Sequence, residues 1–551
     1  MQAWQRFTLW LGALPLRGVT WGLALALSAW AVSDLLVFKL SSGIANSTYD
    51  AMVRARLYAP AADPRIVIID IDEASLQAMS KEFGRWPWPR DTLATVLDHL
   101  EKQQPAAIAW DILFADPDRL SPGGDKAFDA AAGRSLHSHF SVTRLPPAFD
   151  AQSQLDARAL PGLWLTQGSD ATKTSTVALI APALPSVAAG KLGFNNGHPD
   201  ADGVLRRYRY AENLADGSSI QSIALAICRS LNAASNAVSS TVNAIKRIAP
   251  CAHFLPASGL NDVKKPSLIV WRKQANSYPR IPFSDVFAQA EGGKSLRAVP
   301  SFAGKIVLIG STASSLHDIH ASSLGSGHAG VDILATAIDN AINDQRWAEL
   351  PAWLLATTAV LLVLAMAAWV LRHGVKALDH WLIPLPAVLL GISYASLHVG
   401  GLFIDLHLSV GIALLFIALL KLWNGWRHNY WCGDTPVAKD VALLPLHLKM
   451  PAADAGLDRL IRQLELHAPL CRVIGGDASA TWPARLRWPE ALHYVCIHGP
   501  SAQLGLLRSH LAEHDLTYAM GTVSTTSDSS RSSLAQQSQQ LLVQLTIHSK
   551  A

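Results

Sequence analysis

Acidic and imidazole side chains gather near the ends of apolar runs between residues 65 and 320, where a predicted sheet would bring them together. Carboxylate oxygens and imidazole nitrogens in such a place can line a ligand pocket or bind a cation. The candidates are Asp70, Asp72, Glu73, Asp111 and Asp318, with His317 and His320 beside the last. Another interpretation needs no ligand: Asp72 caps a helix, Asp111 bonds to the backbone, and the histidines are ordinary loop residues.

Four apolar runs are predicted as the strands that position these side chains. They span residues 65–72, 106–114, 176–182 and 304–312. Helical crossovers between such runs favour a mostly parallel α/β sheet that is covered on both faces. Ligands of such sheets bind at the carboxyl ends of the strands. Because residues 41–349 contain no Walker loop, no Gly-x-Ser-x-Gly elbow and no His-Glu-x-x-His pair, we expect no catalytic residues, no metal and no cofactor.

A stiff segment with two tryptophans, "GRWPWPR", precedes a predicted helix near residue 90. Each proline fixes its own φ and favours an extended residue before it. We expect this strap to brace the helix against the sheet, with Arg90 pairing with an acidic neighbour or anchoring the helix start. In the alternative, Trp86 or Trp88 contacts a ligand directly.

Long apolar segments indicate a membrane protein. Of the 551 residues, 50% are hydrophobic and 16% charged, and the net charge of +4 without a basic run argues against a nucleic-acid partner. Four stretches are long enough to cross a lipid bilayer as helices, at residues 18–40, 350–371, 381–398 and 402–422.

Lys and Arg in the short flanks set the expected orientation. They occur before residue 18, between the second and third spans, and after the fourth. Residues 1–17 and 432–551 are therefore expected in the cytoplasm, and residues 41–349 outside it. If that side is an oxidising periplasm, Cys228 and Cys251 can form a disulfide, but their spacing does not decide whether they do.

The C-terminal 120 residues are predicted to form a small α+β domain. Strands at 441–450, 492–499 and 541–548 alternate with helices at 456–467 and 501–514, an order that is compatible with a ferredoxin-like fold. The "IGGDAS" segment at 474–479 lacks the Glu-Phe of a diguanylate cyclase signature, and no kinase motif is present. We expect a regulatory or protein-binding module with a cytoplasmic partner.

Several motifs resemble the type-two CHASE domain, an extracellular sensor associated with bacterial cyclases and histidine kinases. They are "IVIIDIDEASLQAMSKEFGRWPWPRDTLATVLDHL", "AAIAWDILFADPD", "GFNNGHPDADGVLRRYRY", "FAGKIVLIGSTASSLHDIHAS" and "HAGVDILATAIDN". The strap and "DADGVLRR" are the specific ones, whereas residues 115–175 are only loosely similar. The resemblance implies a periplasmic α/β sensor, three closely spaced spans after it, and a homodimer.

The expected protein is therefore a bacterial inner-membrane receptor that senses an unidentified periplasmic stimulus and relays it to a non-catalytic cytoplasmic module. Two alternatives stay open. The tail is a degenerate cyclase-like enzyme in one, and the exported domain is an envelope scaffold or part of a transporter assembly in the other.

Overall fold

The chain forms two compact units, which are described separately. The computed structural model describes residues 2–119, 121–166, 176–214, 217–239, 265–432, 441–448, 453–474, 494–514 and 518–525, together with 534, 536–538, 540–542 and 544. One unit, called the sheet unit here, comprises Ser42–Leu350 and Ser393–Ile404. The other, called the bundle unit, comprises Met1–Ser41, Pro351–Ile392 and Asp405–Ala551.

The sheet unit is built on a mostly parallel sheet, as predicted. Its strands run in the order β12-β1-β13-β2-β3, with β6 parallel to β3 and β5 antiparallel to it. Their bounds are β1 Ile66–Ile71, β2 Ala107–Trp110, β3 Ser138–Arg144, β5 Leu179–Ile180, β6 Lys191–Phe194, β12 Arg280–Pro282 and β13 Ile306–Ser311. All six residues of β1 are buried, because helices cover both faces, and this burial explains its continuous apolar run.

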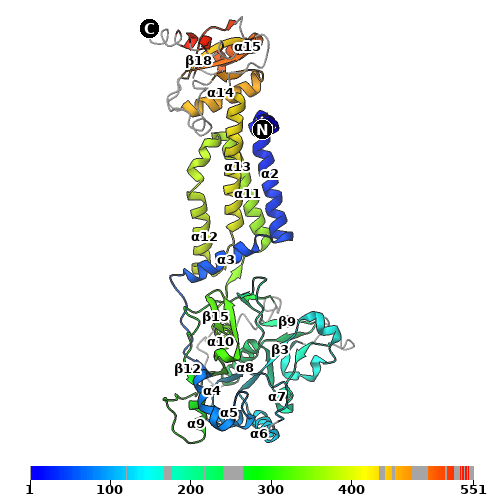
Figure 1. Cartoon of the computed structure of the whole chain (residues 1–551). Helices are drawn as coiled ribbons and strands as arrows, with labels where there is room; N and C mark the ends of the chain where they lie inside the picture. The colour runs from blue at the N-terminus through cyan, green and yellow to red at the C-terminus, as the bar shows by residue number, and fades with distance from the viewer. Residues whose placement is uncertain are drawn as a thin grey trace. The chain divides into compact units, whose positions relative to one another are not determined.

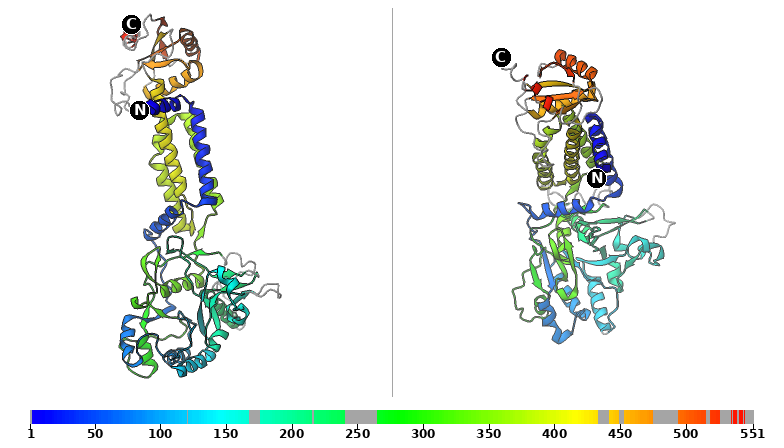
Figure 2. Two further views of the ribbon diagram at one scale, coloured as in Figure 1. Left: turned by 45° about the vertical axis from the view of Figure 1, so that its right-hand side comes forward. Right: turned by 45° about the horizontal axis from the view of Figure 1, so that its top comes forward.

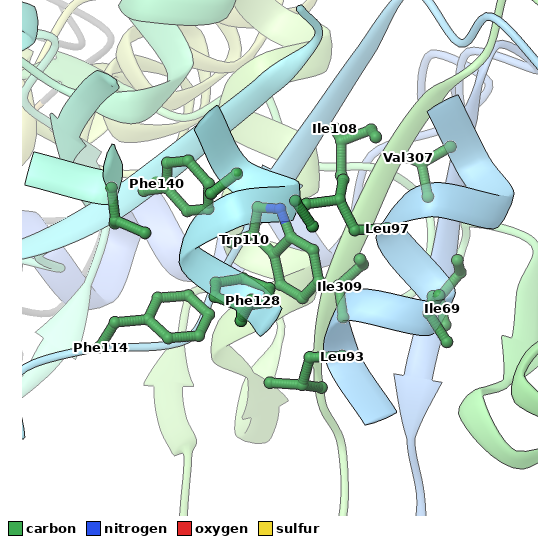
Figure 3. Close-up of a cluster of buried hydrophobic side chains, with 14 of the residues drawn as sticks. Ile69, Leu93, Leu97, Ile108, Trp110, Phe114, Phe128, Phe140, Val307 and Ile309 are labelled. Carbon is green, nitrogen blue, oxygen red and sulfur yellow. The ribbon is translucent and has the colours of Figure 1, made fainter. Parts of the chain in front are cut away.

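Helices on the two faces of this sheet form two separate cores (Figure 1). One face is covered by α4 Glu73–Phe83, α5 Arg90–Lys102, α6 Pro122–Arg134 and α9 Phe283–Ala290. The other is covered by α3 Ser42–Arg54, α8 Ile223–Ser239 and α10 Gly330–Ile342. The first core centres on Trp110, whose ring lies 5.2 Å from Phe128 and 5.9 Å from Phe114 between centroids (Figure 3).

Shorter elements complete the sheet unit. The strands are β4 Trp164–Thr166, β7 Val204–Leu205, β8 Arg207–Tyr208, β9 Ala211–Asn213, β10 Ser219–Gln221, β11 Ser267–Leu268, β14 Ile319–Ser322, β15 Gly325–Ala329, β16 Ala348–Glu349 and β17 Leu402–Phe403. The helices are α7 Pro185–Ala189 and the 3-10 turns η2 Pro147–Gln152, η3 Ala157–Ala159, η4 Pro161–Leu163 and η5 Ser314–Leu316. Cys228 in α8 is buried and disulfide-bonded; Cys251, the candidate partner that the sequence left open, lies outside the described residues.

The bundle unit contains long apolar helices that run side by side (Figure 2). Among the described residues, three helices are long and apolar enough to cross a membrane: α2 Leu16–Ser33 continued by η1 Asp34–Phe38, α11 Ala352–His373 and α13 His407–Trp431. The bent pair η6 Val375–Trp381 and α12 Pro384–Gly400 is a fourth candidate. The last helix begins at His407 rather than at 402, because residues 402 and 403 form β17 and pair with β16. The chain is a multi-pass membrane protein with these candidate spans in contact with lipid.

Asp34 is the one acidic residue in the first candidate span, and local hydrogen bonds satisfy its carboxylate. Its Oδ1 accepts from the Leu40 N–H at 2.8 Å, and its Oδ2 accepts from the Ser41 N–H at 3.3 Å. The side chain is 1% exposed. A charge inside a membrane helix is costly unless it is paired or bonded in this way.

A small antiparallel sheet forms near the C-terminus, also within the bundle unit. Its strands run in the order β19-β20-β18-β21, with β22 beside β18. The bounds are β18 Ala442–Leu448, α14 Ala453–His467, β19 Arg472–Ile474, β20 Tyr494–Gly499, α15 Ser501–His514, β21 Tyr518–Met520 and β22 Ser524–Thr525. The predicted strand at 541–548 is wrong in its described part, because Leu541 and Leu542 are helical. They pack on the sheet face opposite to α14 and α15. Beyond Ile474, the "IGGDAS" segment lies outside the described residues.

Candidate functional site

The first part of the candidate site lies where β1 and β13 end, on the face covered by α10. Asp70, at the end of β1, is 4% exposed. Its carboxylate accepts from the Thr312 N–H at 3.0 Å and from the Thr312 hydroxyl at 2.7 Å. Burial raises the pKa of Asp70, and the hydrogen bonds from Thr312 and the nearby charge of Arg280 oppose that rise.

Arg280 on β12 joins Asp70 to a second buried acid. Its guanidinium lies 3.9 Å from the Asp70 carboxylate and donates a hydrogen bond to Asp332 in the first turn of α10. Asp332 is 1% exposed, and burial raises its pKa to about 6 even though the charge of Arg280 lowers it. Neither Arg280 nor Asp332 was predicted as a site residue.

Asp111 follows β2 and belongs to a neighbouring pair of acids. Asn195 donates to its carboxylate at 2.8 Å. Burial raises the pKa of Asp111 to about 6, and the charge of Asp318 adds to that rise. Asp318 in turn pairs with the His320 ring at 3.0 Å.

Two glycines let the N-terminus of α10 sit directly against these acids. A Cβ atom at Gly310 would lie 2.8 Å from Val331 and 3.1 Å from the Cβ of Asp111. A Cβ atom at Gly330 would lie 2.3 Å from the Asp318 carboxylate. The helix therefore begins beside Asp111 and Asp318 and carries Asp332 in its first turn, so its N-terminal dipole favours the negative charges.

The predicted acidic residues thus separate into two sets. Asp70, Asp111 and Asp318 gather near the start of α10, as described above. Asp72 caps α4 by accepting from the Ser75 N–H at 2.7 Å, and Glu73 accepts from the Ser315 N–H at 3.0 Å. No group of three His, Cys, Asp or Glu residues among those described is placed to hold a metal ion. With pKa values of about 6, the Asp111 and Asp332 carboxyls take up protons in mildly acidic solution. Binding of a ligand by the arrangement stays a prediction.

The strap braces α5. Trp88 is 2% exposed and packs 5.1 Å from Phe283 and 5.0 Å from Trp86 between ring centroids. Arg90 donates to the Asp125 carboxylate of α6 at 2.6 Å, which confirms the predicted acidic partner. Trp88 is therefore a core residue, and ligand contact by half-buried Trp86 stays a prediction.

Asp111→Asn should stabilise the protein above pH 7 by about 1–2 kcal/mol, because it removes a carboxylate whose ionisation burial opposes. The raised pKa of Asp111 contributes stability that is fully present below the unfolded value of about 4 and is lost as the pH rises through about 6. Between about pH 4 and pH 6 the variant should lose less stability than the natural protein. Asp332, whose pKa is also raised to about 6, accounts for part of the loss that remains. Thermal unfolding of the full chain between pH 4 and pH 8 measures both effects, and exposed Glu291→Gln should change neither.

Two adjacent arginines that sequence analysis missed form a second part of the candidate site, called the arginine clamp here. Arg206 is 2% exposed and its guanidinium donates to Asp50 of α3 at 3.0 and 2.7 Å. Arg207 donates to Glu349 of β16 at 3.1 and 2.6 Å. Both also bond to Asp200, at 3.0 Å from Arg206 and 2.8 Å from Arg207. The one available signal was the "DADGVLRR" motif, which the resemblance singled out without assigning a role.

Aromatic packing joins the same segments. Tyr49 of α3 lies 5.2 Å from Phe403 of β17 and 6.2 Å from Trp347 between ring centroids. The strand β16, which holds Glu349, pairs with β17. Charge pairs and apolar contacts therefore hold α3, β16 and β17 together within the sheet unit.

Comparison with known proteins gives one family. The chain matches no curated protein and no solved structure. The family model for the CHASE2 domain matches residues 23–372, which is more than half of the chain. The match includes the acids at the start of α10, the strap and the arginine clamp. The chain therefore belongs to the CHASE2 domain family.

Proposed function

We propose that the protein is a bacterial inner-membrane receptor whose sheet unit receives a periplasmic stimulus and whose membrane helices pass it to the C-terminal domain. The family name supports a sensory role, and the candidate spans on both sides of residues 42–350 support a route through the membrane. The stimulus acts by binding two arrangements of the chain unequally, since only differential affinity can shift such an equilibrium.

The arginine clamp is the observation that carries this proposal. Asp50 lies on α3, which follows the first candidate span in the chain, and Glu349 lies on β16, which precedes the second. Arg206 and Arg207 are neighbours in sequence and share Asp200. A shift in this segment of the sheet unit therefore acts on both chain connections to the membrane.

The proposed output module is the C-terminal domain, for which we propose a ferredoxin-like fold. The order β18-α14-β19-β20-α15-β21 and the sheet order β19-β20-β18-β21 are those of a split βαβ unit. The end of α13 is part of its core: Trp431 is 3% exposed and packs in the same cluster as Leu444 and Leu460. Movement of α13 would therefore carry this domain with it.

Labelling of intact cells tests the proposed orientation. Leu136→Cys in the sheet unit and Leu506→Cys in the C-terminal domain place thiols at positions that are 73% and 67% exposed. In a Cys432→Ser background, a membrane-impermeant maleimide should label the first and not the second until the cells are permeabilised. Labelling of Leu506→Cys alone in intact cells would show the opposite orientation and contradict the proposal.

A turnover assay separates the receptor from the enzymatic alternative. The purified full chain, incubated with nucleoside triphosphates and Mg²⁺ or Mn²⁺, should release neither pyrophosphate nor a cyclic or linear nucleotide product. Steady turnover would show that the protein is an enzyme and that its output module is not non-catalytic. The sensory part of the proposal would be unaffected.

A further inference from the structure

A pocket of about 690 Å³ lies in the sheet unit between the end of α3 and the β14–β15 hairpin. Residues 53, 54 and 56–59 form one wall, and residues 273–275 with the hairpin form the other. A volume of this size is typical of small-ligand sites. None of the acids discussed above lines it.

The lining of the pocket carries positive charge. Arg54, Arg56 and Lys273 line it, and no Asp or Glu does. In the part of the chain that the structure describes, none of these three cations has a carboxylate within ion-pair distance. His328 also lines the pocket but adds no charge at neutral pH, because burial lowers its pKa to about 4.

Arg56 is fixed in position but not neutralised. Its guanidinium is half-buried and donates to the backbone carbonyl of Trp271 at 2.7 Å and to that of Arg272. Burial lowers the pKa of Arg56, and the neighbouring charge of Arg272 lowers it further. The carbonyls hold the guanidinium plane without supplying an anion, so a half-buried cation is left without a counter-charge, which is unfavourable.

The mouth of the pocket is open and partly apolar. Leu57 is 97% exposed and Tyr58 79% exposed. Gly327 lines the hairpin side, and a Cβ atom there would meet nothing within 4 Å. An anion that also carries an apolar part would therefore find contacts for both.

We propose that this pocket binds a phosphate group, with Arg56 as its fixed ligand and the exposed Arg54 and Lys273 closing on it. Arginine binds phosphate through its planar fork and lysine as a point charge. The phosphate comes from an anionic lipid headgroup or from a soluble phosphate compound. Because Val53 and Arg54 belong to α3, occupancy would act on the segment that follows the first candidate span; this consequence rests on the proposed receptor function.

Equilibrium binding to the full chain tests the site with two probes. The protein is placed in phosphatidylcholine nanodiscs, where inorganic phosphate is titrated by calorimetry, and phosphatidylglycerol binding is measured separately by native mass spectrometry. At least one probe should bind, and Arg56→Gln should weaken that binding at least tenfold. Lys294→Gln, which removes an exposed cation from a different pocket between α4, α5 and α9, should leave binding unchanged.

A second variant keeps the test decisive if Arg56→Gln fails to fold. Gly327→Glu adds a carboxylate to an open position, and it should also abolish binding. Phosphate binding assigns a soluble source, and binding of phosphatidylglycerol alone assigns a lipid source. If neither probe binds, or if both variants bind as tightly as the natural chain, the phosphate site is wrong. The assay measures binding and not signalling, so its failure would leave the receptor proposal untouched.

Discussion

Arg206→Gln is expected to lower the free energy of unfolding of the sheet unit by about 3–5 kcal/mol, the usual cost of removing one partner from a buried charge network. The Arg206 guanidinium holds Asp50, Asp200 and Asp202, with donor–acceptor distances of 2.7–3.0 Å. Burial alone would lower the pKa of Arg206, but hydrogen bonds to these three carboxylates raise it above its usual value. Glutamine carries no charge, so the Asp50 carboxylate, which is 10% exposed, would be left without a cation.

Arg207→Gln is the matched control for this prediction. The Arg207 side chain is 25% exposed and its partner Glu349 is 37% exposed, so solvent screens that pair. Its second partner, Asp200, keeps Arg206 when Arg207 is removed, so the whole loss should cost less than about 1 kcal/mol. Thermal unfolding of the full chain in detergent should therefore show a large fall in Tm for Arg206→Gln and a small one for Arg207→Gln. Equal falls for the two variants would contradict the prediction that the deeper burial of Arg206 makes its loss the more costly one.

Arg427→Gln is expected to loosen the C-terminal domain from α13, at a cost of about 2–3 kcal/mol, as for a charged hydrogen bond with a buried partner. The Arg427 side chain is 1% exposed and donates to the Glu465 carboxylate of α14 at 2.8 Å. A second contact supports the same joint: Arg472 of β19 lies over the rings of Tyr430 and Trp431, 4.2 and 4.7 Å from their centroids.

Limited proteolysis of the full chain measures this loosening. Arg427→Gln should be cut faster between α13 and α14, whereas exposed Arg508→Gln on α15 should be cut at the natural rate. If the two variants and the natural chain are cut equally, the contact between Arg427 and Glu465 does not hold the domain on the helix.

Local sequence pattern predicted the parts of the fold that local physics determines. The apolar runs of β1, β2 and β13, the cap at Asp72 and the apolar helices depend on residues close in sequence. By contrast, β3 was missed because its run "SHFSVTR" is polar. Two of its polar side chains bond to distant partners: His139 bonds Ser230 at 2.8 Å, and Arg144 bonds Glu212 at 3.0 Å.

The same reason explains what sequence analysis missed in the candidate site. Asp50 and Arg206 are 156 positions apart, and Arg280 and Asp332 are 52 positions apart. Composition and periodicity contain no information about such pairs. Sequence alone also gives no sign of the role of Gly310 and Gly330, although the start of α10 can approach the acids only because both positions lack a Cβ atom.

Amide hydrogen exchange of the full chain, compared between the natural sequence and Arg207→Gln, tests most directly whether the clamp connects the sheet unit to the C-terminal domain. We expect faster exchange in β16, whose Glu349 loses its partner Arg207, together with a changed rate in β18 and β20. Arg134→Gln, which removes an exposed pair with Asp98, should alter neither region. Changes confined to residues 42–350 would contradict a relay through the membrane helices.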